Sequence, residues 1–390
     1  MRKAIITVAC LILIQVNSGA VFGQTGREGS KTITTAAPFL LVTPDSRAGG
    51  MGEVGVALGK DANATHWNAA SLSFTPGKMG FAMSYSPWLR ALGIPDINLA
   101  YLSGYYDVND NGTIGASLRY FSLGTIEYTD INATTIGEDR PNEFALDVAY
   151  SLKVTESLGA AVSLRYFYSR LASNNNVIGD IKPVNSVAGD LSLYYEKPFK
   201  IGGARGDVPV TFSAGINLSN IGPKVSYTSN TSASDFIPVN MRIGYAFRFE
   251  VDEYNSVTFA NDFNKLLVPS VQVDASGAVI GGGGRSDEPL LSGIFGSFGD
   301  AQDGFGEELA EINTSLGLEY WYRDLFAARI GFYYEDPEKG NRKFITLGAG
   351  LRYNVFGLDF AYLAPLEQNH PLQNTLRFTL TYDFDSEGNE

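Results

Sequence analysis

Apolar and polar residues alternate with a period of two along most of the chain after residue 79. In the stretch 375–384, for example, every second residue is large and apolar, and Arg, Thr or Asp lies between them. The same pattern recurs at 326–335 and at 241–250. Because successive side chains of a β-strand point to opposite faces, this pattern predicts strands with one apolar and one polar face.

The apolar faces of these strands are typical of contact with lipid. In a β-sandwich the apolar faces form a packed interior and the polar faces meet solvent. Here the strands are about ten residues long, they often end in Tyr, Phe or Trp, and their polar faces carry Arg, Glu and Gly, as in a membrane barrel with aromatic girdles and a polar lumen. We therefore expect an all-β fold, a transmembrane antiparallel β-barrel.

Counting the alternating segments predicts about 14 strands, an even number that places both termini on the periplasmic side of an outer membrane. The segments are 79–87, 96–107, 112–122, 142–153, 157–170, 187–196, 208–219, 239–250, 255–264, 311–322, 325–335, 343–354, 356–363 and 373–384.

Short and long connections alternate between these segments, as expected for short periplasmic turns and long external loops. The tight turns are at 109–112, 155–156, 252–253, 323–324 and Val355. The long loops are 123–141, 171–186, 220–238 and 265–310, of which the last is the longest. A medium turn at 198–207 is the one departure from the rule.

The N-terminal part of the chain differs from the rest. Arg2 and Lys3 precede an apolar run that is followed by small and polar residues, so residues 1–23 are expected to be a secretory signal peptide that removes the single cysteine, Cys10. Residues 24–78 do not alternate and are rich in small residues, which favours a luminal plug or periplasmic hatch. Residues 79–390 would then form the barrel.

Composition argues against chemistry and against nucleic acid as a partner. The chain has 29 basic and 42 acidic residues, a net charge of -13, and only two histidines. We therefore expect no catalytic, metal-binding or cofactor-binding residues. A calcium loop beginning at Asp107 lacks the required carboxylate at Leu118, and the glycine run 281–286 lacks the lysine of a phosphate loop. A deacylase would need His66 or His370 beside a serine and a carboxylate.

Several arginines are expected on the luminal faces of the strands, where acidic side chains can pair with them and partly occlude the lumen. The arginines recur in Leu-Arg-Tyr tripeptides, at Arg119, Arg165 and Arg352, and the acids are Asp147, Asp262, Glu319, Glu335, Asp359 and Asp383.

Two of the expected external loops contain apolar residues that are candidates for binding a partner. They are Trp88, Leu89, Leu92 and Ile94 in the first loop, and Leu290, Leu291, Ile294, Phe295 and Phe298 in the longest loop. The spacing in the longest loop predicts a short amphipathic helix. This helix either caps the barrel mouth or contacts a partner.

The segment after the expected signal peptide carries a recognisable signature. Residues 37–52 read APFLLVTPDSRAGGMG and residues 61–70 read DANATHWNAA. This closely resembles the PorV (LptO) family of type IX secretion, within the FadL-like barrel group. The signature residues are Pro44, Asp45, Arg47, Gly49, Gly50, Met51, Gly52, His66, Trp67 and Asn68. The family usually has Asn-Pro-Ala after the Trp, so Ala69 is a departure that affects the rigidity of this turn.

The resemblance implies a non-enzymatic carrier in the outer membrane. Such proteins bind the C-terminal signal domain of secreted cargo at the outer-membrane translocon. They deliver it to a surface attachment complex, where a sortase joins the cargo to lipopolysaccharide. The implied partners are these proteins, membrane lipid and lipopolysaccharide. The alternative is a FadL-type transporter of hydrophobic small molecules, which needs a continuous apolar cavity, since fold alone does not define function.

Overall fold

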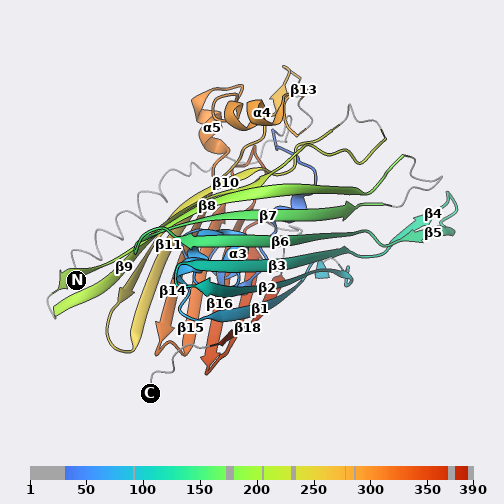
Figure 1. The fold of residues 1–390 in the computed structure, drawn as a ribbon. Helices are drawn as coiled ribbons and strands as arrows, with labels where there is room; N and C mark the ends of the chain where they lie inside the picture. Colours follow the sequence, from blue (N-terminus) through green and yellow to red (C-terminus); the bar gives the residue numbers. More distant parts are fainter. Residues whose placement is uncertain are drawn as a thin grey trace.

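The computed structural model describes residues 31–90, 93–172, 180–203, 206–229, 234–276, 278–284, 287–367 and 374–384. Fourteen of its strands form one closed antiparallel barrel in which β1 pairs with both β2 and β18 (Figure 1). The predicted fold is therefore confirmed.

The barrel strands follow the predicted segments closely. They are β1 (Met79–Pro87), β2 (Ile97–Asn109), β3 (Gly112–Leu123), β6 (Asn142–Lys153), β7 (Leu158–Arg170), β8 (Val184–Gly203), β9 (Gly206–Ile221), β10 (Asn240–Glu250), β11 (Asn255–Leu266), β14 (Asn313–Tyr322), β15 (Phe326–Tyr334), β16 (Lys343–Tyr353), β17 (Phe356–Pro365) and β18 (Thr375–Phe384).

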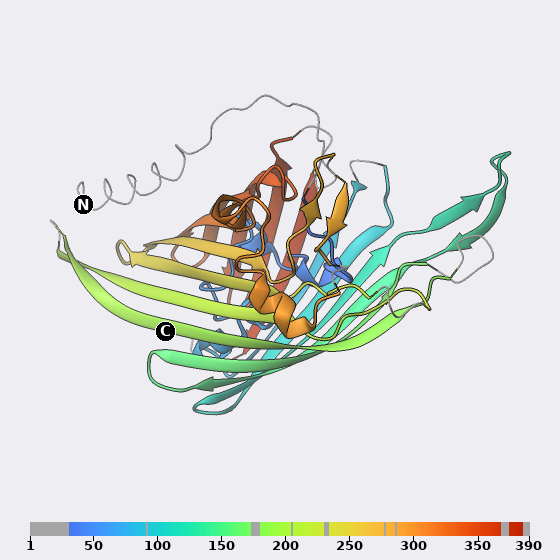
Figure 2. The ribbon, with the colours of Figure 1, turned by 90° about the horizontal axis from the view of Figure 1, so that it is seen from above.

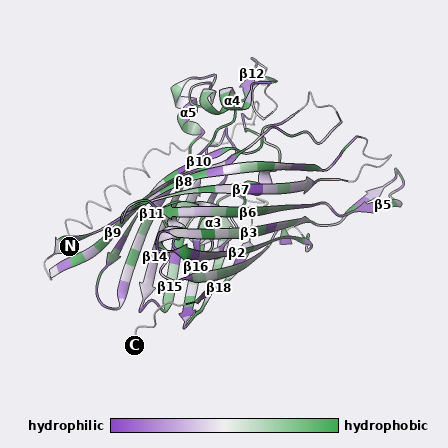
Figure 3. Ribbon diagram, in the orientation of Figure 1, coloured by the Kyte–Doolittle hydropathy of each residue, from purple (hydrophilic) through white to green (hydrophobic). Residues whose placement is uncertain are grey.

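Apolar and polar residues alternate along the strands of the wall as the sequence predicts (Figure 3). In β18, Phe378 and Leu380 are exposed on the outside, whereas Arg377 and Thr379 are buried on the inside. An apolar exterior of this kind matches lipid, and the polar interior is covered by other protein groups. No helix in the described part of the chain is long and apolar enough to cross a membrane.

All the tight turns lie at one end of the barrel, here called the short-turn end, and the longer loops lie at the other, the long-loop end. The predicted medium turn at 198–207 is wrong. The hairpin of β8 and β9 continues through it as far as the pair Gly203 and Gly206, so this connection is also tight. Pro198, at the start of the predicted turn, and Pro209 lie where the ribbon extends past its neighbouring strands, and such free edges tolerate proline.

The long-loop end carries additional structure. Two small hairpins are formed by β4 (Ile126–Thr129) with β5 (Thr135–Asp139) and by β12 (Gln272–Val273) with β13 (Val279–Gly281). The longest loop also forms the helices α4 (Leu290–Gly296) and α5 (Phe305–Ala310), which lie at the top of Figure 1. The predicted amphipathic helix is confirmed in α4, whereas α5 and the hairpins were not predicted.

Residues 31–78, here called the inner segment, lie inside the ring of strands (Figure 2). They form four short helices: η1 (Pro38–Leu41), α2 (Ser46–Gly49), α3 (Ala64–Trp67) and η2 (Ala69–Phe74). The segment enters β1 at the short-turn end, where Met79 pairs with Phe384 of β18. The even strand count thus brings both ends of the strand set together.

Candidate functional site

The signature residues fold into one compact cluster, here called the signature cluster, in the middle of the lumen. Asp45 caps the start of α2 by accepting a hydrogen bond from the Ala48 backbone N–H at 2.9 Å. Its other carboxylate oxygen accepts a hydrogen bond from Nε1 of Trp67 at 2.6 Å. Asp45 therefore joins the two halves of the signature, which are 22 residues apart in the sequence.

Arg47 connects the signature cluster to the barrel wall. Its guanidinium donates to both carboxylate oxygens of Glu319 on β14, at 3.1 and 2.9 Å, and also reaches Asp61 at 3.3 Å. Glu319 is fully buried and also accepts from Arg329 at 2.6 Å. This network keeps the buried carboxylate paired and hydrogen-bonded, as a charge inside a protein requires.

The glycines of the signature allow backbone to touch backbone. Gly52 has a φ of +73°, a conformation that favours glycine, and its N–H donates to Thr346 Oγ1 at 2.8 Å. A Cβ on Gly331 of β15 would lie 1.9 Å from the Gly52 nitrogen. A Cβ on Gly50 would lie 2.9 Å from Cα of Gly348. The inner segment therefore fits directly against β14 to β16 with no room for side chains.

His66 and Asn68 bind the opposite wall. Nδ1 of His66 lies 2.7 Å from Nη2 of Arg119. Burial, reinforced by nearby arginines, holds the pKa of His66 well below its usual range, so the neutral ring accepts this hydrogen bond. Asn68 donates to the carbonyls of Val56 and Leu193, and its side-chain oxygen accepts from the Ala70 N–H at the start of η2. This cap holds the turn in which Ala69 replaces the usual proline.

The predicted ion pairs of the lumen are present for most of the named groups. Arg119, Asp262 and Asp383 are the exceptions, since none of them forms an ion pair within the described residues. Arg119 instead donates to the carbonyl oxygens of Phe39 and Leu40, each at 2.7 Å. Asp262 also differs, since it accepts the N–H groups of Gly55 and Val56. The pairs found are Arg165 with Asp147 and Asp190, Arg352 with Asp359, and Arg342 with Glu335.

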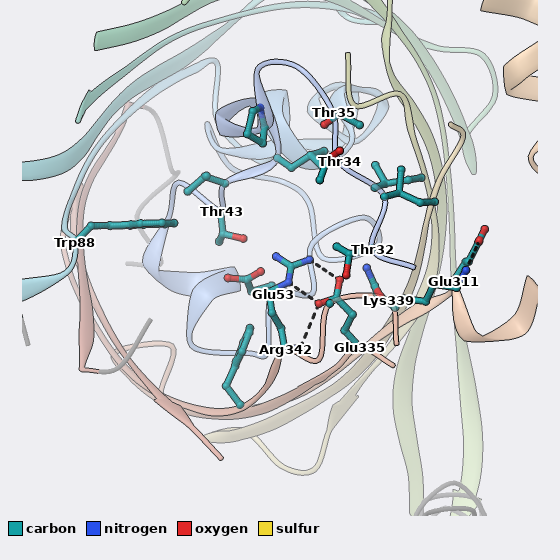
Figure 4. A pocket seen from close by; sticks show the side chains of 18 of the residues that line it. Thr32, Thr34, Thr35, Thr43, Glu53, Trp88, Glu311, Glu335, Lys339 and Arg342 are labelled. Atoms are coloured by element: carbon teal, nitrogen blue, oxygen red, sulfur yellow. Dashed lines mark hydrogen bonds and ion pairs between the residues drawn. The ribbon is translucent and has the colours of Figure 1, made fainter. Parts of the chain in front are cut away.

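Two cavities that share no lining residue lie on opposite sides of the inner segment. The outer vestibule, at the long-loop end, has a volume of about 470 Å³ and is lined by Thr34, Trp88, Glu335 and Arg342 among others (Figure 4). The second cavity, at the short-turn end, has a volume of about 740 Å³ and is lined by groups such as Lys60 and Glu196. Both carry many charged and hydroxyl side chains.

The predicted apolar anchors divide into two groups. Trp88 packs edge-on against Phe121, and Leu290 and Ile294 join the same apolar core at the long-loop end. Ile294 is only 5% exposed, so it holds α4 in place and presents no surface to a partner. Leu89 is half-buried, and Leu92 lies outside the described residues.

The remaining anchors face outward. Leu291, Phe295 and Phe298 are 63%, 73% and 50% exposed, and Ile94 is also exposed. The sequence reasoning missed further exposed apolar residues in the same loop, namely Val279, Ile280, Phe305 and Leu309. The spacing of Phe305 and Leu309, four residues apart, was a signal for the second helix. We call Leu291, Phe295 and Phe298 the α4 surface.

Comparisons with known proteins agree with this architecture. A family model described as "Type IX secretion system protein PorV" matches residues 25–273, which is more than half of the 390 residues. Among curated protein sequences, none matches this chain significantly.

Two solved structures of similar proteins were compared with this chain. The "TodX deltaS2S3 mutant monoaromatic hydrocarbon channel" is 14% identical and aligns over 87% of this chain and 99% of its own, with a TM-score of 0.53. The toluene transporter TbuX of Ralstonia pickettii is 12% identical over 87% of this chain and 97% of its own, with a TM-score of 0.49.

At 14% identity, the likeness to the TodX variant shows the fold alone. The family model covers the signature cluster, the inner segment and most of the strands that enclose them. The chain therefore belongs to the PorV family, and it is an outer-membrane protein of type IX secretion.

Proposed function

We propose that this protein is a carrier that binds the C-terminal signal domain of secreted cargo and moves it from the outer-membrane translocon to the sortase of the attachment complex. The observation that carries the proposal is the α4 surface. Leu291 and Phe295 face outward on the short helix α4, and Phe298 is exposed two residues after its end, at the end of the barrel where the long loops lie. Exposed apolar groups of this kind usually mark binding sites.

The way α4 is anchored supports a role in recognition. Ile294 is buried against the core, and Gly293 packs closely on Phe236, where a Cβ would lie 2.6 Å from the ring. After the helix, Asp300 accepts hydrogen bonds from the Ser270 backbone and hydroxyl. Because these contacts hold the helix against the core, its outward residues lose little conformational entropy on binding, which favours affinity.

The alternative function, transport of a hydrophobic small molecule, needs a continuous apolar path. The inner segment separates the outer vestibule from the second cavity, and it is attached to the wall by Arg47, Gly52 and Asn68. A transporter that uses the inner segment as its gate, with a lateral opening in the wall, would have to break these buried contacts whenever the gate opens. The carrier requires no movement of the inner segment, and for this reason we favour it.

The proposed function does not involve catalysis. In the described part of the chain, Nδ1 of His66 is hydrogen-bonded to Arg119, and its Nε2 is buried without a partner. A buried neutral imidazole that faces an arginine is poorly suited to activate a serine. His370 lies outside the described residues.

The proposal is tested by purifying the tagged protein from detergent-solubilised outer membranes and identifying what accompanies it. We expect secreted proteins that share a C-terminal domain, and their loss when this domain is deleted from the cargo. Recovery of bound fatty acid or hydrocarbon with no such protein would contradict the carrier and support the transporter.

A further inference from the structure

We propose that the end of the β8–β9 hairpin binds the phosphate head groups of the phospholipid leaflet at the short-turn end of the barrel. Residues 197–203 and 206–209, here called the β8–β9 extension, are the part of this hairpin that passes beyond the neighbouring strands. Its outward apolar face lies against the lipid, and its lysines bind the phosphates. The β8–β9 extension is therefore a lipid contact outside the ring of strands.

The β8–β9 extension projects away from the other hairpins at the short-turn end (Figures 1 and 2). The pairing of β8 with β7 ends at Tyr195, and the pairing of β9 with β10 ends at Val210. The two strands nevertheless stay paired with each other as far as Gly203 and Gly206. At about 3.3 Å per residue, residues 197–203 reach roughly 20 Å farther than the neighbouring strands.

The cavity at the short-turn end shows which side chains of the hairpin face inward. Glu196, Thr211 and Ser213 line this cavity. Because side chains alternate along a strand and directly paired residues share a face, the residues between them face outward. The outward pairs are Lys197 with Phe212, Phe199 with Val210, and Ile201 with Val208.

This outward face continues the surface that the barrel presents to lipid. Phe212 packs on Phe247 with 5.0 Å between ring centroids, and Phe249 stacks on Phe247 at 6.3 Å. Aromatic girdles of this kind lie at the membrane interface of barrels. Phe199 and Ile201, each 39% exposed, come directly after this girdle along the hairpin, so they reach the level of the head groups.

The charge of the β8–β9 extension suits an anionic surface. Lys197 and Lys200 are exposed, and neither forms an ion pair within the described residues. The short turns at 109–112, 155–156, 252–253 and 323–324 each carry a carboxylate, in a chain whose net charge is -13. Basic side chains near a membrane surface are attracted to anionic lipid. The two lysines therefore single out this hairpin among the short turns.

The free edges of the β8–β9 extension are protected against pairing with another strand. Pro198 in β8 and Pro209 in β9 have no backbone N–H. Proline and lysine on an edge strand oppose the addition of a further strand. Contact through the outward face is therefore favoured over contact through the edges, and for this reason we assign lipid as the occupant and not a protein that adds a strand.

The lipid contact is tested with a fluorophore on single cysteines in the purified protein, reconstituted into phosphatidylglycerol vesicles that contain nitroxide-labelled lipid. The only native cysteine, Cys10, belongs to the expected signal peptide. Ile201→Cys places the fluorophore on the outward face, and Asp207→Cys, which pairs with Gly202, places it on the inward face as the matched control. We expect the nitroxide to quench about half of the fluorescence at residue 201 and little at residue 207.

The lysines are tested in the same vesicles. Lys197→Gln and Lys200→Gln should each lower the ratio of quenched to unquenched fluorophore at residue 201 about fivefold, because a basic residue near an anionic surface contributes about this factor. Phosphatidylcholine vesicles should weaken the quenching of the parent in the same way. Unchanged quenching in both variants would overturn the binding of phosphates by the lysines.

Two results would overturn the contact with lipid itself. One is equal quenching at residues 201 and 207 in protein whose barrel is folded. The other is a photo-activated cross-linker at residue 201 that joins one discrete protein in cells and no lipid, which would assign the outward face to a protein partner.

Discussion

The junction between the inner segment and the barrel wall contrasts with the α4 surface. At the junction, the glycines bring backbone against backbone, and Glu319 is buried between Arg47 and Arg329. At the α4 surface, large apolar side chains are exposed on a helix of seven residues and just after its end. The junction contains most of the family signature, whereas the α4 surface lies outside the matched residues 25–273.

This difference suggests a division of roles. Close packing and buried ion pairs hold the inner segment in one position, since such contacts are costly to break. Exposed apolar side chains contribute little to folding but are available to a partner. We therefore expect substitutions at the junction to affect stability and substitutions at the α4 surface to affect binding.

The largest effect on stability is expected for Gly331→Ala. The new methyl group would lie 1.9 Å from the Gly52 nitrogen, and a backbone atom cannot move aside. Overpacking of this kind should cost about 3 kcal/mol of unfolding free energy. Thermal unfolding in detergent provides the measurement. The control is Gly306→Ala in α5, where a Cβ meets no atom within 4 Å, and equal melting temperatures for the two variants would contradict the close fit.

The next largest effect is expected for Arg47→Met. Glu319 would keep Arg329 as a partner but lose its bidentate bond to Arg47, at a cost of about 2 kcal/mol. Lys153→Met is the matched control, because its partner Glu156 is exposed and such pairs contribute less than about 1 kcal/mol. Chemical denaturation of both variants checks this order, and a larger loss for Lys153→Met would refute it.

The charged cluster around Glu307, in the longest loop, should show a smaller effect on stability that depends on pH. Burial opposes the charged form of Glu307, but hydrogen bonds from Lys339, the Asp303 N–H and Lys31 lower its pKa to about 2. Because its pKa is lower in the folded protein, the charged Glu307 carboxylate stabilises the fold fully above the ordinary value of 4.5. This stabilisation is lost as the pH falls toward 2. At pH 5 to 8, the unfolding free energy of Glu307→Gln should therefore be about 1 kcal/mol below that of the parent, and the variant should melt at a lower temperature.

This difference between Glu307→Gln and the parent should shrink between about pH 4.5 and pH 2, when the native carboxylate becomes protonated. Other groups of the cluster are common to both proteins, among them Glu308, Glu311 and Lys265. Melting curves across this range measure the effect. A difference that already disappears near pH 6 would mean that Glu307 is not held by its lysines.

The smallest effect on stability is expected at the α4 surface itself. Replacing Leu291, Phe295 and Phe298 together by Ser should change the unfolding free energy by less than about 1 kcal/mol, because these side chains are largely exposed. Ile294→Ala, one turn away but buried, should cost about 2 kcal/mol. If the triple variant were the less stable of the two, the α4 surface would be part of the fold.

Sequence periodicity predicted the strands well because a half-buried strand repeats every two residues and lipid makes the contrast strong. It could not show which apolar residue of α4 faces inward, so Ile294 was expected at the surface. The contact of Arg47 with Glu319 joins residues 272 apart and has no local signal. The signature indicated the family, but only the folded chain shows that its glycines and charges attach the inner segment to the wall.

The most direct test of the account is cargo recovery with the triple variant Leu291→Ser, Phe295→Ser, Phe298→Ser. We predict that the purified variant retains the melting temperature of the parent but recovers at most about a tenth of the secreted proteins that share a C-terminal domain, since a few apolar anchors dominate most interfaces. Unchanged recovery of cargo by the folded variant would contradict the claim that the α4 surface is where this carrier binds.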